Sequence, residues 1–159
     1  MNDFFNLPLG AALLSWLIAQ MIKMLTYLLN NRKINFERLL GAGGMPSSHS
    51  AAVCAIAVAI ARTQGADSAV FAVSAILALI VMYDASGVRR AAGMHAKEIN
   101  QIKNIIEEWE AENRVKLEEP DEEIIEEKKA QLKEFLGHSP LEVLFGALLG
   151  IAVGLMMNF

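Results

Sequence analysis

Four stretches of this chain are almost free of charged residues, and they constrain its fold more than any other feature. They cover residues 4–29, 51–61, 68–83 and 143–159. A fifth stretch, residues 97–134, is dense in Glu and Lys and separates the third apolar stretch from the fourth. Apolar stretches near bilayer length, interrupted by one charged stretch, predict a polytopic membrane protein with a polar insertion. A soluble α-helical bundle is the alternative.

The predicted fold class is therefore all-α. We expect one membrane domain over residues 1–159, a bundle of about four membrane helices, with a charged helical hairpin at 97–134 inserted into it. Apolar residues recur near helical spacing on both sides of the sequence Glu118-Glu-Pro-Asp121, which predicts two amphipathic arms and a turn. The charged faces are expected to be solvated, with partner binding or a lid over the site as the alternatives.

Composition limits the partners. The net charge is −4 and no basic stripe with interleaved aromatic residues occurs, so a nucleic-acid partner is not expected. The single Cys54 lies in an apolar run, where a packing role is expected. The N-terminus lacks the features of a cleaved signal peptide, so the first apolar stretch is expected to be a retained membrane helix. A homodimer assembled through the hairpin remains open.

The first apolar helix contains a lysine. Gln20, Lys23 and Tyr27 recur at spacings of three and four residues and therefore share a face. A lysine inside an apolar helix is costly in lipid, so it either faces a polar interior or extends to the membrane surface. The sequence leaves both alternatives open for Lys23.

A glycine-rich turn, Gly41-Ala-Gly-Gly-Met-Pro-Ser-Ser-His-Ser50, leads into the second apolar stretch. Pro46 favours an extended residue before it, and Ser47 or Ser48 is suited to cap the helix that follows. Free backbone N–H groups, hydroxyls and the His49 imidazole would then gather at one helix N-terminus, which favours anions. The alternative is a flexible loop and a capped helix in which His49 only packs.

Counting membrane crossings places this turn on the same side as residues 84–90 and the end of the first helix. Asp67 is expected to cap the third helix, and the hairpin returns the chain to the same side at 137–140. Arg62 is almost the only basic residue on the opposite side. The shared side has the other basic residues: Arg32, Lys33, Arg38, Arg89, Arg90 and Lys97. The positive-inside tendency predicts that this side is cytoplasmic.

His138 and Glu142 lie four residues apart at the start of the last helix, close enough for the carboxylate to accept a hydrogen bond from the imidazole. Such a bond would fix the tautomer and make the other ring nitrogen more nucleophilic. Ser139-Pro-Leu-Glu142 also fits a capping box with proline at the first helical position. The two interpretations are compatible in part.

These motifs resemble the type 2 phosphatidic acid phosphatase and vanadium haloperoxidase superfamily. Pro46-Ser-Ser-His49 is similar to its P-S-G-H element. Gly137-His-Ser-Pro-Leu-Glu142, followed by Gly146-Ala-Leu-Leu-Gly150, is similar to its H-x-x-x-D element and the small-residue helix after it. Together with Asp84-Ala-Ser-Gly-Val-Arg-Arg90, the pattern most resembles the divergent PAP2 group of small membrane proteins.

The resemblance implies a membrane phosphatase, in the plasma or inner membrane, that acts on a phosphomonoester or diphosphate, expected to be lipid-linked. It implies a reaction without a metal or other cofactor, with His138 as nucleophile, Glu142 as the acid that orients it and His49 as general acid. The same resemblance implies a set of phosphate-binding residues: Ser47, Ser48, Gly44, Arg89 or Arg90, and Lys23.

Several residues depart from the superfamily pattern. Glu142 replaces an aspartate, Ser48 stands where glycine is usual, and no K-x6-R-P element is found. His95 is a rival nucleophile because it follows Arg89 at the superfamily's spacing, but Ile99 stands where its orienting acid would be. The alternative function is a non-catalytic protein that binds or transports lipid phosphates with the same pocket.

Overall fold

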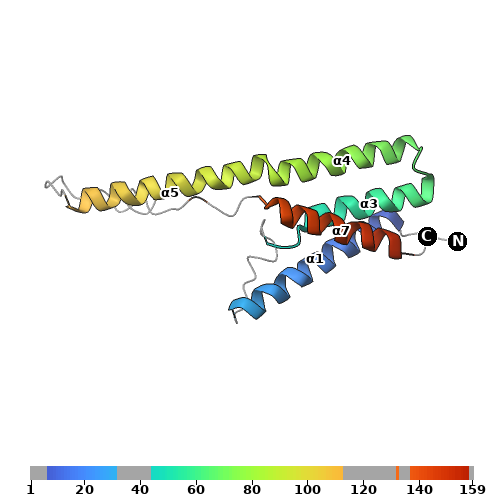
Figure 1. Ribbon diagram of the computed structural model, residues 1–159, viewed down its shortest axis with the longest axis horizontal. Coiled ribbons are helices and arrows are strands. Elements are labelled where there is room, and N and C mark those ends of the chain that lie inside the picture. The colour runs from blue at the N-terminus through green and yellow to red at the C-terminus, as the bar shows by residue number, and fades with distance from the viewer. Residues whose placement is uncertain (1–6, 32–43, 113–131, 133–136, 158–159) are drawn as a thin grey trace.

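The computed structural model describes residues 7–31, 44–112, 132 and 137–157, and this part of the chain contains helices joined by turns, with no strand. The helices are α1 (Leu7–Asn31), α3 (Ser48–Gln64), α4 (Ala69–Ser86), α5 (Val88–Glu112) and α7 (Pro140–Met156) (Figure 1). The all-α prediction is confirmed.

Helix α3 lies at the centre of the bundle and packs against α1, α4 and α7. The core is built from small side chains, with Ala11 of α1 and Ala55 and Ala59 of α3 fully buried. Small residues let helix backbones approach closely, which is the main source of helix association in a bilayer.

Three glycines at four-residue spacing, Gly146, Gly150 and Gly154, form the face of α7 that meets α3. A Cβ atom at Gly146 would overlap the carbonyl oxygen of Ser47, and one at Gly150 would overlap that of Ala51. Only glycine permits this approach, so the stripe determines how deeply α7 packs against α3.

The exposed surface of α1, α4 and α7 is mostly apolar. Large aliphatic side chains such as Leu13, Leu17, Ile76 and Ile80 are exposed, whereas the buried positions are mostly Ala, Gly and Ser. This is the reverse of a soluble bundle and indicates surroundings of lipid. Two described helices, Leu7–Leu29 and Ala69–Trp109, are long and apolar enough to span a membrane, and the shorter α7 is also apolar.

Helices α4 and α5 form one almost straight rod in Figure 1, interrupted only at Gly87, whose N–H still donates to the Tyr83 carbonyl oxygen at 2.8 Å. Residue 97, where the charged insertion was expected to begin, therefore lies inside a helix that starts at Val88. The expected turn at 118–121 lies outside the described residues. Asn100 exchanges two hydrogen bonds with the backbone of Leu132, which places this later residue beside α5.

At the end of the bundle away from residue 138, the cap of α4 differs from the prediction. Ser68, and not Asp67, is the N-cap: its Oγ accepts from Phe71 N at 3.2 Å and donates to the Gly65 carbonyl at 2.8 Å. Ser68 is the extended residue next to the first helical turn, so its hydroxyl is the one in reach. Nearby, the Arg62 guanidinium donates to carbonyl oxygens at the C-terminus of α7, including Met157 at 2.6 Å.

Candidate functional site

The structure brings together the N-terminus of α3, the C-terminal end of α4 and the N-terminus of α7. Ser47 N donates to the Glu142 carbonyl oxygen at 2.9 Å and thereby joins the first turns of α3 and α7. His138 N donates to the Ala85 carbonyl oxygen at 2.9 Å and joins α7 to the end of α4. Polar segments far apart in the sequence therefore meet at one end of the bundle.

Ser47 is the N-cap of α3. Its Oγ accepts from Ser50 N at 3.4 Å and from Ser50 Oγ at 3.0 Å, and its side chain is fully buried. The sequence allowed either Ser47 or Ser48 to be the N-cap, and in the structure it is Ser47. Because the Ser47 hydroxyl is occupied by the cap, Ser48 is the serine of the pair that presents its hydroxyl to another helix.

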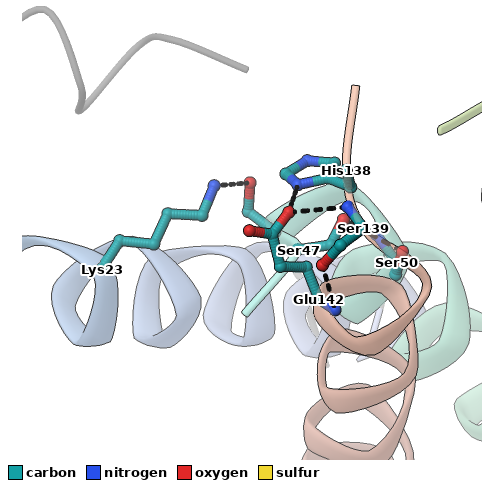
Figure 2. A network of polar contacts seen from close by, with 7 residues as sticks. Lys23, Ser47, Ser50, His138, Ser139 and Glu142 are labelled. Carbon is teal, nitrogen blue, oxygen red and sulfur yellow. Dashed lines mark hydrogen bonds and ion pairs between the residues drawn. The ribbon is translucent and has the colours of Figure 1, made fainter. Parts of the chain in front are cut away.

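Lys23 extends from α1 toward α7, as Figure 2 shows, and its Nζ donates to Ser48 Oγ at 3.2 Å. The residue is only 9% exposed. Of the two alternatives for this lysine, the polar interior is therefore the one observed. Gly44 lies beside the same side chain, with a positive φ of 87° that favours glycine, so the glycine-rich turn borders the lysine.

His138, Ser139 and Glu142 form the centre of the site (Figure 2). Glu142 Oε2 accepts from His138 Nδ1 at 3.1 Å and from Ser139 N at 3.0 Å, while Ser139 Oγ accepts from Glu142 N at 3.3 Å. The capping box and the histidine–carboxylate contact therefore coexist on one carboxylate oxygen. The capping box holds Glu142 in the rotamer that reaches the imidazole.

The contact with Glu142 determines which nitrogen of His138 carries the proton. A carboxylate accepts hydrogen bonds, so Nδ1 is the protonated nitrogen of the neutral ring and Nε2 holds the lone pair. Nε2 is buried and has no hydrogen-bond partner among the described residues. Burial lowers the pKa of His138 from its ordinary value of 6.5; the charges of Lys23 and Arg89 act in the same direction, against the opposing effect of Glu142. The ring is therefore neutral near pH 7.

Arg89 is on the first turn of α5, and its Nε donates to the Asp84 carboxylate in an exposed ion pair. Arg90 is also exposed. Gly137 packs its backbone directly against these residues: it has a φ of 96°, and a Cβ atom there would overlap Arg90 N and the Arg89 carbonyl carbon. This contact places Arg89 close enough to His138 for its charge to act on the imidazole.

The other two histidines differ in position. His49, in the first turn of α3, is exposed but within electrostatic range of His138, Lys23 and Arg89. His95 is exposed on α5, and no hydrogen bond or ion pair found among the described residues joins it to this cluster. The structure thus groups two of the three histidines with the cationic residues.

Two features of the site were missed in the sequence. The Ala85 carbonyl that receives His138 N is a backbone group and leaves no sequence signal. The Asp84–Arg89 pair spans five residues, outside the three- and four-residue spacing of one regular helix, and it forms across the break at Gly87. Only the joint between α4 and α5 brings those two side chains together.

The arrangement can bind an anion and transfer a group to nitrogen. Lys23 and Arg89 supply positive charge, the helix N-termini supply N–H groups, and His138 supplies a ring nitrogen held by a carboxylate. Among the described residues, no group of three or more His, Cys, Asp or Glu side chains could hold a metal ion.

Lipid-facing helices surround a buried histidine that contacts a half-buried carboxylate, and the comparison with known families identifies a PAP2-related membrane protein. Residues 4–153 match the divergent PAP2 family, and the chain belongs to this family, as its motifs predicted. It is similar to the uncharacterized membrane protein YuiD of Bacillus subtilis (strain 168), with 43% identity over 156 residues, which are 97% of this chain and 95% of that protein. No solved structure matches the chain at a significant level.

Proposed function

We propose that the protein is a membrane phosphohydrolase that releases phosphate from a phosphomonoester or diphosphate, with a lipid-linked substrate as the favoured class. The observation that carries the proposal is the His138–Glu142 contact at 3.1 Å. It leaves the Nε2 lone pair of a neutral imidazole free to attack phosphorus beside two cationic side chains.

The proposed reaction has two steps. In the first, His138 Nε2 forms a bond to phosphorus while the bond to the leaving oxygen breaks, and His49 donates a proton to that oxygen. The product is a phosphohistidine and an alcohol, or a phosphate monoester if the substrate is a diphosphate. In the second step, water attacks phosphorus, His49 takes its proton, and inorganic phosphate leaves as Nε2 regains its lone pair.

The surrounding residues have different parts in this scheme. Glu142 keeps the proton on Nδ1 and stabilises the positive charge that the ring acquires on phosphorylation. Lys23, Arg89 and the hydroxyl of Ser48 would bind the phosphoryl oxygens, where charge accumulates in the transition state. Ser47 would contribute backbone and cap geometry, since its hydroxyl is already bonded to Ser50. Gly44 would offer its backbone, and Arg90 is exposed next to Arg89.

The location of the site supports an amphiphilic substrate. The cluster lies at the end of apolar, outward-facing helices, where a lipid tail could remain in the bilayer while its phosphate reaches the polar cluster. The excess of Arg and Lys on this side supports a cytoplasmic site.

The three histidines allow an internally controlled test. Phosphate release by the purified protein in detergent is measured for His138→Ala, His49→Ala and His95→Ala. We expect a loss of about 10³-fold or more for His138→Ala and of about 10²-fold or more for His49→Ala. His95→Ala should retain wild-type activity, because this residue is exposed on α5.

Activity that survives both His138→Ala and His49→Ala would refute the scheme. Denaturation of wild type after labelling with radioactive substrate should trap an acid-labile phosphohistidine, and His138→Ala should not. Addition of a chelator should leave the rate unchanged, which would separate this reaction from two-metal phosphatases.

The second candidate is a protein that binds or transports lipid phosphates without hydrolysing them. It is favoured by the burial of His138, which is 3% exposed, because an attacking nitrogen must first be reached by substrate. Vanadate binding that is lost in Lys23→Ala, with no phosphate release by wild type on any substrate, would support this candidate over the enzyme.

A further inference from the structure

Asn100 is a buried carboxamide in the charged part of helix α5. It is 4% exposed, and Ala96 one turn earlier is 6% exposed, so one face of this helix is covered. Both polar groups of the Asn100 side chain bond the backbone of one residue: Nδ2 donates to the Leu132 carbonyl oxygen at 2.9 Å, and Leu132 N donates to Oδ1 at 3.0 Å. The Leu132 side chain itself is exposed. The contact therefore fixes the backbone at residue 132, whatever side chain stands there.

A second contact joins the same part of the chain to α5 five residues later. Gly137 packs against the backbone of the first turn of α5, where a Cβ atom on the glycine would overlap Arg90 N. The next residue, His138, donates its N–H to the Ala85 carbonyl oxygen at the end of α4 at 2.9 Å. Leu132, Gly137 and His138 are therefore all attached to the rod that α4 and α5 form (Figure 1).

The two contacts on α5 lie far apart relative to the length of chain between them. Arg90 and Asn100 are ten residues apart in one helix, which corresponds to about 15 Å along its axis. Five residues of chain lead from Leu132 to Gly137, and this length reaches at most about 18 Å. Because so little chain length is spare, fixing Leu132 on α5 also restricts where Gly137 and the adjoining His138 can lie.

We propose that Asn100 is a positioning residue for His138. It holds the backbone of Leu132 on α5, and the chain fixed in this way keeps His138 bonded to Ala85 and its imidazole directed at Glu142. Such positioning matters because a misplacement of about 1 Å lowers a catalysed rate by about 10²-fold. The charged region after residue 97 thereby contributes to the site. The effect on phosphate release rests on the proposed function, whereas the positioning of His138 does not.

The exchange rate of the His138 amide hydrogen tests the proposal without an assay of activity. This hydrogen is bonded to Ala85, so it exchanges with solvent only when this part of the chain opens. In the full-length protein in detergent, followed by NMR, we expect Asn100→Ala to raise the exchange rate at least about fivefold, because two hydrogen bonds that oppose opening are lost. The matched control is Asn104→Ala, one turn further along α5, where the asparagine is exposed and exchange should stay as in wild type.

A second pair of variants removes one of the two bonds and leaves α5 unchanged, which keeps the test decisive if Asn100→Ala does not fold. Leu132→Pro lacks the N–H that donates to Asn100, so exchange at His138 should again be faster than in wild type. Leu132→Ala keeps this N–H and should exchange as wild type does. Wild-type exchange in Asn100→Ala or in Leu132→Pro would overturn the proposal, as would equally fast exchange in Leu132→Ala and Leu132→Pro.

Phosphate release, measured where every variant is folded, separates positioning from a purely structural role. Asn100→Ala should lower kcat about tenfold and leave KM within about twofold of wild type, because Lys23 and Ser48, which would bind the phosphate, lie on α1 and α3. Asn104→Ala should keep both constants. Faster exchange at His138 with an unchanged kcat would overturn the positioning role. If wild type releases no phosphate, the proposed function fails, and the exchange rates still decide whether Asn100 positions His138.

Discussion

Replacing Gly150 by Ala tests whether the glycine stripe of α7 positions the site. A Cβ atom at this position would lie under 3.0 Å from the carbonyl oxygen of Ala51 and 2.9 Å from the Cβ of Cys54. The first of these atoms belongs to the backbone of α3 and cannot rotate away. Since an ordinary carbon–oxygen contact is about 3.3–3.6 Å, the two helices must separate by about 1 Å.

Two opposing effects determine the magnitude. Overpacking of a close helix contact costs about 1–3 kcal/mol, and alanine in place of glycine within a helix recovers up to about 1 kcal/mol. Gly10→Ala isolates the second effect, because nothing lies within 4 Å of a Cβ at Gly10. The two variants should therefore differ by about 1–3 kcal/mol, which is roughly 2–12 °C in Tm for a chain of this size.

The assay is the fraction of folded protein in detergent after heating, followed by phosphate release at a temperature where every variant is folded. We expect Gly10→Ala to be as stable as wild type or more stable, and Gly150→Ala to be less stable. Activity of Gly150→Ala should fall by about 10²-fold, since a shift of about 1 Å misplaces His138 and Glu142 relative to Lys23 and Ser48. Gly154→Ala should be milder, because its Cβ would lie 2.9 Å from the Cβ of Val58 and 3.0 Å from the Ala55 carbonyl oxygen, a smaller overlap than at Gly150. Wild-type Tm and activity in Gly150→Ala would refute the reasoning.

Three further perturbations probe the site. Gly137→Ala should destabilise the fold by about 1–3 kcal/mol or more and lower phosphate release, because a positive φ and the backbones of Arg89 and Arg90 both exclude a side chain. The control is Gly65→Ala, which has a similar φ at the other end of the bundle and should lose stability but keep its activity when folded. Asp84→Asn should change stability by less than about 1 kcal/mol, since the ion pair with Arg89 is exposed. Because the charge of Arg89 is then no longer offset, this variant should bind vanadate about two- to fivefold more tightly, whereas Asp67→Asn should bind it as wild type does. Burial lowers the pKa of His138 below 6.5, so the unfolded chain takes up a proton first as pH falls, and the folded state loses stability below pH 6.5. His138→Gln should therefore show a smaller decrease of Tm with falling pH. A dependence of Tm on pH identical to that of wild type would contradict this prediction.

Local features of the site could be predicted from the sequence because their partners lie within one helical turn. His138 and Glu142 are four residues apart, Ser139 and Glu142 three apart, and Ser47 immediately precedes an apolar helix. Spacing alone determines such contacts. What the sequence left as two alternatives for Glu142, a cap or a partner for the histidine, the structure realises together because one carboxylate oxygen can accept twice.

Features that depend on packing could not be predicted in the same way. The direction of Lys23 is decided by where α1 crosses α3, and the Asp84–Arg89 pair by the joint at Gly87. The charged composition of residues 97–134 predicted a separate insertion, yet the helix that enters it begins at Val88 and continues the line of α4. The composition shows where charged residues become frequent, but the helix continues in the same direction across that point.

The electrostatics of the site favour an anion over a cation, although a carboxylate lies at its centre. Helices α3 and α7 both begin there, and each N-terminus is equivalent to roughly half a positive charge. Lys23 and Arg89 add two full charges, of which Asp84 offsets that of Arg89 at the surface. Glu142 accepts from the neutral His138 ring and from Ser139 N, so its single negative charge remains in the site and offsets part of the charge of Lys23. Lys23 and the two helix N-termini together exceed this one negative charge among the described residues that form the site, and a phosphate group would supply the remainder.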